Sequence, residues 1–253
     1  MAGRGALVTG VSRRAGIGYA IAARLRELGA DVFVQSFVPH DAGQPWGADP
    51  AGPPALADEL GAAGLLECDF SDPAAPADCM SAAAEALGHV DILVANHAMS
   101  CDQNLEALDA AAIDATLAVN VRATLLLVQA YAARHDDQRP GGRVLIFTSG
   151  QHLEPMTREL PYAASKGALH GITASLAAHL APRGILVNAL NPGPTDTGWA
   201  TPELLAHELR RLPLGRWGAP EDAARLAGWL VTDDAGWLTG QVITSDGGFS
   251  LSR

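Results

Sequence analysis

Lysine is almost absent from this sequence, which has one lysine, Lys166, beside sixteen arginines in 253 residues. Aromatic residues are also few, at 5%, whereas 48% of the residues are hydrophobic. This composition excludes a disordered or fibrous chain, and the length is sufficient to bury the core of one α/β domain. We therefore expect a single domain that spans residues 1–253.

Positive charge is scarce, because 17 basic residues stand against 28 acidic ones and give a formal net charge of −11. Nucleic acids and acidic membrane surfaces attract clustered positive charge, so neither is an expected partner. No apolar run reaches the roughly 20 residues of a membrane span, and the N-terminus lacks a signal-peptide pattern. We expect a cytoplasmic protein.

Cysteine is scarce too, and its three copies are Cys68, Cys79 and Cys101. They cannot all pair within the chain, and they show no metal-ligand spacing such as CxxC. We expect a reduced setting, no metal site, and cysteines that act as small, partly buried side chains.

Seven short apolar runs alternate with longer amphipathic stretches, a pattern typical of βαβ units and a parallel sheet. Ile17, Ile21, Leu25 and Leu28 recur at spacings of four, four and three, which predicts a helix that Gly29 ends. The expected strands are 6–9, 32–35, 65–68, 92–95, 144–148, 185–190 and 242–244. The further expected helices are 73–87, 107–134, 162–181, 202–211 and 220–231.

Two segments are expected outside this regular pattern. Residues 38–54 are rich in proline and glycine and predict a surface loop. Residues 195–214 could form a lid over a ligand site.

A glycine-rich turn follows the first expected strand and leads directly into the first helix. It reads Thr9-Gly10-Val11-Ser12-Arg13-Arg14-Ala15-Gly16-Ile17-Gly18. Glycines let the backbone approach a pyrophosphate, and the free N–H groups and positive dipole end of the helix attract it. The alternative is an ordinary glycine-rich turn.

Tyr162 and Lys166 are four residues apart, so they share one face of the expected helix. A phenol has a pKa of about 10, and a nearby ammonium lowers it, so Tyr162 could exchange protons with a substrate oxygen. Ser149 stands just beyond an expected strand, where it could hydrogen-bond the same oxygen. Taken singly, a helix-face pair or a serine at a strand end has ordinary structural roles.

Together, the glycine turn and the set of Ser149, Tyr162 and Lys166 resemble the short-chain dehydrogenase/reductase (SDR) family of the YxxxK type. The similarity extends over residues 7–248 and includes members such as 3-oxoacyl-acyl-carrier-protein reductases. It implies a Rossmann-type, doubly wound parallel sheet of about seven strands with helices on both faces. It also implies that Asn120 anchors a proton relay leading to Lys166.

The resemblance implies an NAD(P) cofactor, but the glycine turn departs from the family's usual TGxxxGxG. Five residues separate Gly10 from Gly16, a spacing similar to that of enoyl-acyl-carrier-protein reductases in the same superfamily. The residues expected to bind the cofactor are Gly10, Ser12, Arg13, Arg14, Gly16, Ile17, Gly18, Ser36, Asp69, Phe70, Asn96, Tyr162, Lys166, Pro192, Gly193, Thr195 and Thr197.

The second strand decides the expected cofactor type. It ends Gln35-Ser36-Phe37, without the carboxylate that would bind the ribose hydroxyl of NAD and repel the 2′-phosphate of NADP. Arg13 and Arg14 could hold that phosphate, since guanidinium groups offer paired donors. NADP(H) is therefore favoured over NAD(H), unless the arginines are solvated surface residues or Asp41 alters the balance.

Two histidines are unexpected on the resemblance. After the fourth strand the family usually has Asn-Asn-Ala-Gly, whereas this chain has Ala95-Asn96-His97-Ala98. His97 could line the cofactor cleft, but a hydrogen-bonded structural histidine is the favoured interpretation. His152, three residues after Ser149, could meet a substrate.

The resemblance implies an oxidoreductase that interconverts a small-molecule ketone and a secondary alcohol, with Tyr162 as general acid and base. A 3-oxoacyl thioester reductase, an enoyl reductase and a non-catalytic dinucleotide-binding regulator are the alternatives. The family resemblance also implies a homotetramer or homodimer.

Overall fold

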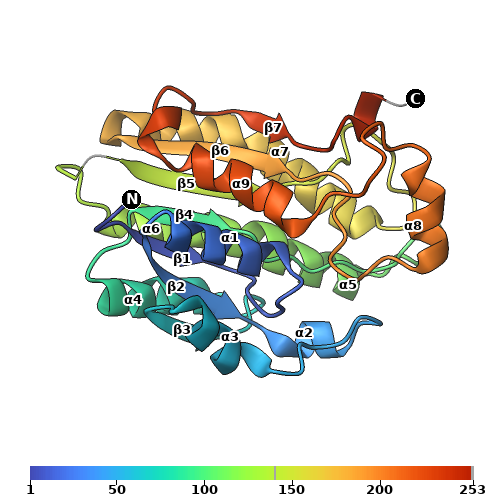
Figure 1. Cartoon of the computed structure of the whole chain (residues 1–253), viewed down its shortest axis with the longest axis horizontal. Coiled ribbons are helices and arrows are strands. Elements are labelled where there is room, and N and C mark those ends of the chain that lie inside the picture. The colour runs from blue at the N-terminus through green and yellow to red at the C-terminus, as the bar shows by residue number, and fades with distance from the viewer. Residues whose placement is uncertain (140, 252–253) are drawn as a thin grey trace.

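Seven parallel strands form one sheet in the computed structural model, which describes residues 1–139 and 141–251. Their order across the sheet is β3-β2-β1-β4-β5-β6-β7, as Figure 1 shows. The chain winds outward from β1 in both directions, which confirms the expected Rossmann-type, doubly wound fold. The strands are β1 (Gly5–Val8), β2 (Asp31–Ser36), β3 (Gly64–Glu67), β4 (Ile92–Ala95), β5 (Gly142–Phe147), β6 (Ile185–Asn191) and β7 (Val242–Thr244).

Helices cover both faces of the sheet (Figure 1). Side chains of α1 and α9 share one apolar core with the sheet, and side chains of α4, α6 and α7 share the other. The helices are α1 (Ile17–Glu27), α2 (Val38–Ala42), α3 (Gly52–Leu60), α4 (Ala75–Leu87), α5 (Ala110–Leu117), α6 (Ala123–Arg134), α7 (Leu160–Leu180), α8 (Pro202–Leu209) and α9 (Pro220–Leu230). Short 3₁₀ turns occupy Leu105–Ala107, Ala181–Arg183, Asp233–Ala235 and Phe249–Leu251.

Strand β1 illustrates how one short strand serves both cores. Ala6 and Val8 lie in the core with α1, whereas Leu7 lies in the core with α4, because successive side chains of a strand alternate between faces. A strand that is buried on both faces reads as an unbroken apolar run, which explains why such runs predicted the central strands. The edge strands β3 and β7 are only half-buried, and all seven expected strands still agree with the structure to within two residues at each end.

The expectation of a surface loop over residues 38–54 holds for residues 43–51 and is wrong at both ends. Helix α2 occupies Val38–Ala42, and α3 begins at Gly52. Both helices carry proline in their first turn, where the missing N–H would have no partner inside the helix. Pro39, Pro53 and Pro54 therefore mark helix starts, whereas Pro45 and Pro50 lie in the turns between the two helices.

The expected helix over residues 107–134 is interrupted by a π turn. Helix α5 ends at Leu117, the wider π turn covers Ala118–Arg122, and α6 follows directly. The 25-residue stretch from Ala110 to Arg134 has a mean hydropathy of 1.6 and by length and composition could cross a membrane. It packs against α4 and α7 in this fold, and it carries buried Asn120 at its middle.

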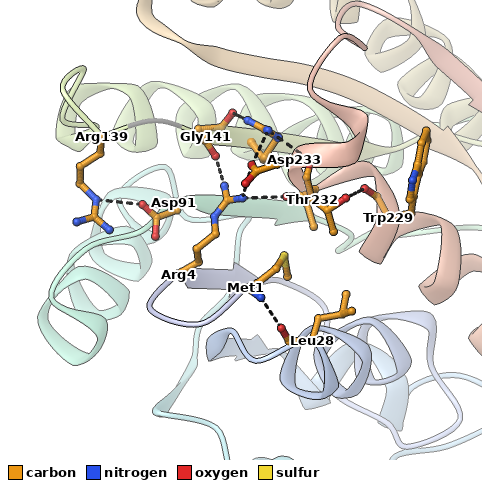
Figure 2. A network of polar contacts seen from close by, with 12 residues as sticks. Met1, Arg4, Leu28, Asp91, Arg139, Gly141, Trp229, Thr232 and Asp233 are labelled. Carbon is orange, nitrogen blue, oxygen red and sulfur yellow. Dashed lines mark hydrogen bonds and ion pairs between the residues drawn. The ribbon is translucent and has the colours of Figure 1, made fainter.

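The edge of the sheet opposite the carboxyl ends of the strands is closed by polar contacts that Figure 2 shows from close by. The Asp91 carboxylate accepts the buried N–H of Gly5 at 2.9 Å and also accepts from Arg139 at 3.2 Å. Arg4 donates to the carbonyls of Gly141 and Val231, so it joins three parts of the chain. These contacts lie at the end of the sheet where α/β folds do not usually bind ligands. The opposite end, formed by the carboxyl ends of the strands, is the usual place for a ligand site.

Candidate active site

The glycine turn is closed so tightly that glycine is required at two of its positions. Gly10 has a φ of +74°, and a Cβ there would lie 2.9 Å from the Asn96 amide nitrogen. A Cβ on Gly18 would collide with the carbonyl oxygen of Gly10. The turn therefore packs the start of α1 directly on the ends of β1 and β4.

This turn fits the phosphates of a dinucleotide. Helix α1 begins after Gly16 with no side-chain cap and no acidic residue in its first turn, so its N–H groups and positive dipole end can meet an anion. The Ser36 hydroxyl at the end of β2 is buried and has no hydrogen-bond partner among the described residues. An unpaired buried hydroxyl beside such a turn suits a ligand that carries hydrogen-bonding groups.

Gln35 shapes this turn, a role that no pattern in the sequence indicated. Its side-chain oxygen accepts the N–H of Gly10 at 3.0 Å, and its amide nitrogen donates to the carbonyls of Ser36 and Cys68. The side chain is 1% exposed, so the shape of the turn depends on a buried amide that binds two neighbouring strands.

The two arginines of the turn are both paired with carboxylates. Arg13 lies 3.0 Å from Asp41 of α2, donates to the carbonyl of Thr197 at 2.9 Å and covers the ring of Trp46. Arg14 is bound by Glu59 and Asp49 instead. Arg13 is half-buried, whereas Arg14 is exposed, in line with the alternative that one of the two is a solvated surface residue. Any 2′-phosphate would have to compete with Asp41 for Arg13.

Ser149, Tyr162 and Lys166 are brought together at the carboxyl edge, where α7 crosses the end of β5. The Ser149 side chain is hydrogen-bonded to the Tyr162 phenol, and the Lys166 ammonium lies 5.6 Å from the centre of the Tyr162 ring. Lys166 is 2% exposed and donates to the carbonyl of Phe147 at 2.8 Å. The helix spacing of four indeed places the phenol and the ammonium on one face.

Burial controls the proton affinities of this pair. It raises the pKa of Tyr162 to about 12, against a smaller lowering by the bond from Ser149. It lowers the pKa of Lys166 to about 8, since a buried ammonium loses its hydration. The expectation of a lowered Tyr162 pKa is thus wrong for the protein by itself, because desolvation and the Glu159 charge raise the pKa and outweigh the bond from Ser149.

Asn120 lies in the π turn and is fully buried. Its side-chain oxygen accepts the N–H of Met99 at 2.7 Å, and its amide nitrogen donates to the carbonyl of Met99 and to the Ser165 hydroxyl, both at 2.9 Å. Ser165 precedes Lys166 on α7, so Asn120 connects the loop after β4 with the helix that carries the phenol and the ammonium.

The remaining expected cofactor residues line the same edge. Asn96 donates to the carbonyls of Thr9 and Gly10, and buried Phe70 packs edge-on against His97 with ring centres 4.5 Å apart. Asp69 is occupied locally, since it accepts the N–H of Ser71.

The segment after β6 begins with a constrained turn. Gly193 has a φ of +65°, and the Thr195 hydroxyl donates back to the carbonyls of Pro192 and Gly193. Thr197 is held through its carbonyl by Arg13, so the end of this turn touches the glycine turn.

The two unexpected histidines differ in their surroundings. His97 is hydrogen-bonded through both ring nitrogens and buried, as the structural interpretation expects. His152 is exposed and stacks edge-on with His170 of α7, with ring centres 4.4 Å apart. Burial and the neighbouring imidazole lower the pKa of His152.

The expected lid, residues 195–214, contains α8 and lies beyond the carboxyl ends of the strands, at the right of Figure 1. Arg211 binds this segment to the rest of the protein, because one of its guanidinium nitrogens donates to both carboxylate oxygens of Glu154 at 2.9 Å. Another guanidinium nitrogen donates to Glu208, within the segment, at 2.7 Å. Its guanidinium also covers the ring of Phe249 at 4.4 Å. The sequence contained no spacing that could have paired Glu154 with Arg211.

Several known proteins are similar to this chain in sequence and in fold. A family model described as enoyl-(acyl carrier protein) reductase matches residues 10–250. The chain is 39% identical over 226 residues to an uncharacterized oxidoreductase, YjdA, of Bacillus subtilis, with 87% of this chain and 86% of that protein covered. It is 32% identical over 237 residues to a cyclohexanol dehydrogenase of Rhodococcus sp., with 88% and 87% covered.

Among solved structures, a short-chain dehydrogenase of Burkholderia cenocepacia in complex with NADP superposes with a TM-score of 0.85 at 34% identity, with 98% of each chain covered. The chain belongs to the short-chain dehydrogenase/reductase family of oxidoreductases.

If Arg211 holds the lid segment, Arg211→Gln should loosen it. We expect amide hydrogens of residues 199–212 to exchange about tenfold faster, because the variant loses the contacts to Glu154, Glu208 and Phe249. Hydrogen exchange followed by mass spectrometry measures this directly.

Arg225→Gln is the matched control, since Arg225 is exposed and pairs with Asp222 of its own helix. Equal exchange of residues 199–212 in the wild type and Arg211→Gln would show that the segment is held by other contacts.

Proposed function

We propose that this protein is an NAD(P)-dependent oxidoreductase that interconverts a small-molecule ketone and a secondary alcohol. The observation that carries the proposal is the convergence of a partly buried phenol, a buried ammonium and a hydrogen-bonded serine at the carboxyl edge of the sheet. This set lies at the edge that also carries the glycine turn, where α/β folds bind ligands.

Each residue of the set has a separate task. The Ser149 hydroxyl donates a hydrogen bond to the carbonyl oxygen, and Tyr162 transfers its proton to that oxygen in reduction or accepts it in oxidation. The Lys166 ammonium provides positive charge beside the phenol and a donor for ribose hydroxyls. A bound nicotinamide supplies or takes up the hydride, and the protein supplies orientation and proton handling.

The proton affinities favour the reductive direction in the resting protein. With a pKa of about 12, Tyr162 holds its proton at neutral pH, which is the form that protonates a carbonyl oxygen. Lys166, with a pKa of about 8, is mostly charged at pH 7 and becomes neutral above pH 8. Reduction should therefore weaken as the pH rises through this range, since the positive charge beside the phenol is lost.

Asn120 is proposed to anchor the proton relay that leads to Lys166. Its bonds to Met99 and Ser165 hold it at the base of α7, next in sequence to the lysine. The cofactor-binding roles given above to the glycine turn, Ser36, Asp69, Phe70, Asn96 and the turn after β6 likewise remain proposals.

NADP(H) remains the proposed cofactor over NAD(H). The end of β2 has no carboxylate, the Ser36 hydroxyl is unpaired among the described residues, and Arg13 can change partners from Asp41 to a phosphate. A phosphate dianion attracts a guanidinium more strongly than a single carboxylate does. Arg14 has a weaker case, because Glu59 and Asp49 both hold it.

An enoyl reductase is the second candidate, favoured by the long glycine turn and by the description of the matching family model. A 3-oxoacyl thioester reductase and a dinucleotide-binding regulator without turnover complete the alternatives. Consumption of NADPH, followed by its absorbance, should occur with members of a panel of ketones and be reduced in Tyr162→Phe by about 10²-fold or more. Consumption with enoyl thioesters alone would favour the second candidate, and tight NADPH binding without any consumption would favour the regulator.

The homotetramer or homodimer remains a prediction from the family resemblance, and the cytoplasmic location remains a prediction from the sequence pattern. Exposed Trp229 of α9 and fully exposed Trp237 are large apolar side chains that an assembly could cover.

Replacement of the buried ammonium should separate activity from stability. We expect Lys166→Met to lose nearly all turnover and yet to raise the free energy of unfolding by about 1–3 kcal/mol at pH 7, because it removes a desolvated charge. The gain should shrink as the pH rises above 8, where the wild-type side chain becomes neutral in the folded protein but keeps its proton when unfolded. Denaturant unfolding at several pH values measures the difference.

Lys166→Arg is the matched variant that keeps the charge. It should remain folded and still lose most activity, because a guanidinium is larger, planar and differently hydrated than an ammonium. Near-wild-type turnover in either variant would contradict the proposed role of Lys166.

The cofactor proposal predicts a difference between the two arginines of the glycine turn. Arg13→Gln should raise the Kd for NADP⁺ by about tenfold or more and change the Kd for NAD⁺ by less than about threefold, since NAD⁺ has no 2′-phosphate for Arg13 to bind. Fluorescence titration of the purified protein provides both constants.

Arg14→Gln serves as the control and should leave both constants nearly unchanged. Asp41→Asn should tighten NADP⁺ binding by freeing Arg13 from its present partner. Equal effects of Arg13→Gln on the two dinucleotides would contradict a 2′-phosphate role.

A further inference from the structure

The loop after β4 carries a buried imidazole that the proposed chemistry does not use. His97 is 8% exposed, and each of its ring nitrogens has a partner from a different part of the chain. Nδ1 lies 2.8 Å from the hydroxyl of Thr9, at the start of the glycine turn. Nε2 lies 3.1 Å from the carbonyl oxygen of Val119, in the π turn that also contains Asn120.

The partners fix the proton positions on this ring. A backbone carbonyl can only accept, so Nε2 carries a hydrogen and donates it to Val119. Burial and the nearby Lys166 charge lower the pKa of His97 to about 3, so the ring is neutral and Nδ1 is an acceptor. The Thr9 hydroxyl has two acceptors within reach, the Val94 carbonyl at 3.2 Å and Nδ1 at 2.8 Å, and donates to the closer Nδ1. It also accepts the N–H groups of Asn96 and His97 at 3.0 and 3.2 Å.

The result is a directed pair of hydrogen bonds that runs from Thr9 through the imidazole to Val119. A π turn widens the helix and disturbs its regular ladder of hydrogen bonds, so its carbonyls depend more on outside partners. In this turn the carbonyl of Val119 accepts from His97, and the carbonyl of Asn120 accepts from the Thr124 hydroxyl at 2.7 Å.

The same loop and π turn are joined a second time, by the Asn120 side chain. It binds the N–H and the carbonyl of Met99, two residues after His97. The imidazole bond and this pair of amide bonds together hold one face of the π turn against the loop, and Ser165 continues the contact to α7.

We propose that His97 is a positioning residue, a neutral imidazole clamp that sets the π turn, and with it Asn120, against the glycine turn. This proposal rests on the proposed function in so far as Asn120 serves the proton relay. The clamp joins the side of the site that meets phosphates to the side that handles protons, through one side chain. The family's usual alanine at this position has no group that could form either bond.

Two amide variants can separate the two bonds. His97→Gln places an amide nitrogen at about the distance of Nε2 and keeps a donor for Val119, whereas His97→Asn places a carbonyl oxygen near Nδ1 and keeps only an acceptor for Thr9. The two variants are equally polar and uncharged, so a general loss of packing should affect both. His97→Ala removes both bonds.

The first measurement needs neither cofactor nor turnover. The amide hydrogen of Met99, which donates to Asn120, should exchange at least about tenfold faster in His97→Asn and His97→Ala, and within about threefold of the wild type in His97→Gln. The ¹⁵N shifts of His97 should show the Nε2–H form and no titration between pH 5 and 9. Titration near the ordinary histidine pKa, an Nδ1–H form, or equal Met99 exchange in both amide variants would overturn the clamp.

The second measurement tests its effect on the reaction. We expect kcat to fall by about 10–100-fold in His97→Asn and His97→Ala, with the KM for the dinucleotide changed by less than about threefold, and to be largely restored in His97→Gln. Thermal midpoints of all three variants serve as the measure of packing. Equal kcat values in the Gln and Asn variants would assign His97 to stability alone.

The two sets of results also distinguish the clamp from the proposed function. Absence of turnover in the wild type would refute the proposed function, and the exchange and ¹⁵N data would still decide whether His97 holds the π turn.

Discussion

A buried ammonium group is the constraint around which the carboxyl edge of this sheet is organised. Lys166 has one hydrogen bond to a protein group among the described residues, the carbonyl of Phe147, and it has no carboxylate nearby to offset its desolvation. Such a charge is stable only if the surrounding fold supplies the free energy. The two apolar cores on the faces of the sheet do so, and they allow α7 to hold the ammonium beside the phenol of Tyr162.

The other parts of the edge are tied to this helix by directed hydrogen bonds. Asn120 reaches α7 through Ser165, and His97 fixes the π turn that contains Asn120. Thr9 then connects the imidazole to the glycine turn, which Gln35 shapes from the other side. Two of these four links are to backbone groups, and all of them join different parts of the chain, so the site is a property of the parallel sheet and not of one segment.

The fold could be predicted from the sequence because fully buried parallel strands give continuous apolar runs, and the αβ alternation between them was clear. The helices at 38–42 and 52–60 were missed because proline favours both loops and helix starts, and only packing distinguishes the two. The π turn was also hidden, since the apolar pattern of residues 107–134 continues across it.

The site could be predicted only in part. Ser149, Tyr162 and Lys166 could be found because their spacing in sequence reflects their chemistry. Arg13 with Asp41, and Glu154 with Arg211, meet only through the tertiary fold. The pKa of Tyr162 was misjudged for a related reason, because spacing shows the neighbouring charge but not the desolvation.

The burial of the single lysine has a consequence for handling this protein in the laboratory. No lysine ammonium lies on its surface, because the one in the sequence is 2% exposed. Reagents that acylate lysine to attach fluorophores, cross-links or solid supports will therefore find no exposed lysine side chain on the folded molecule. Slow modification of Lys166 by such a reagent would instead report how often the carboxyl edge opens, which makes the sole lysine an internal probe of local unfolding.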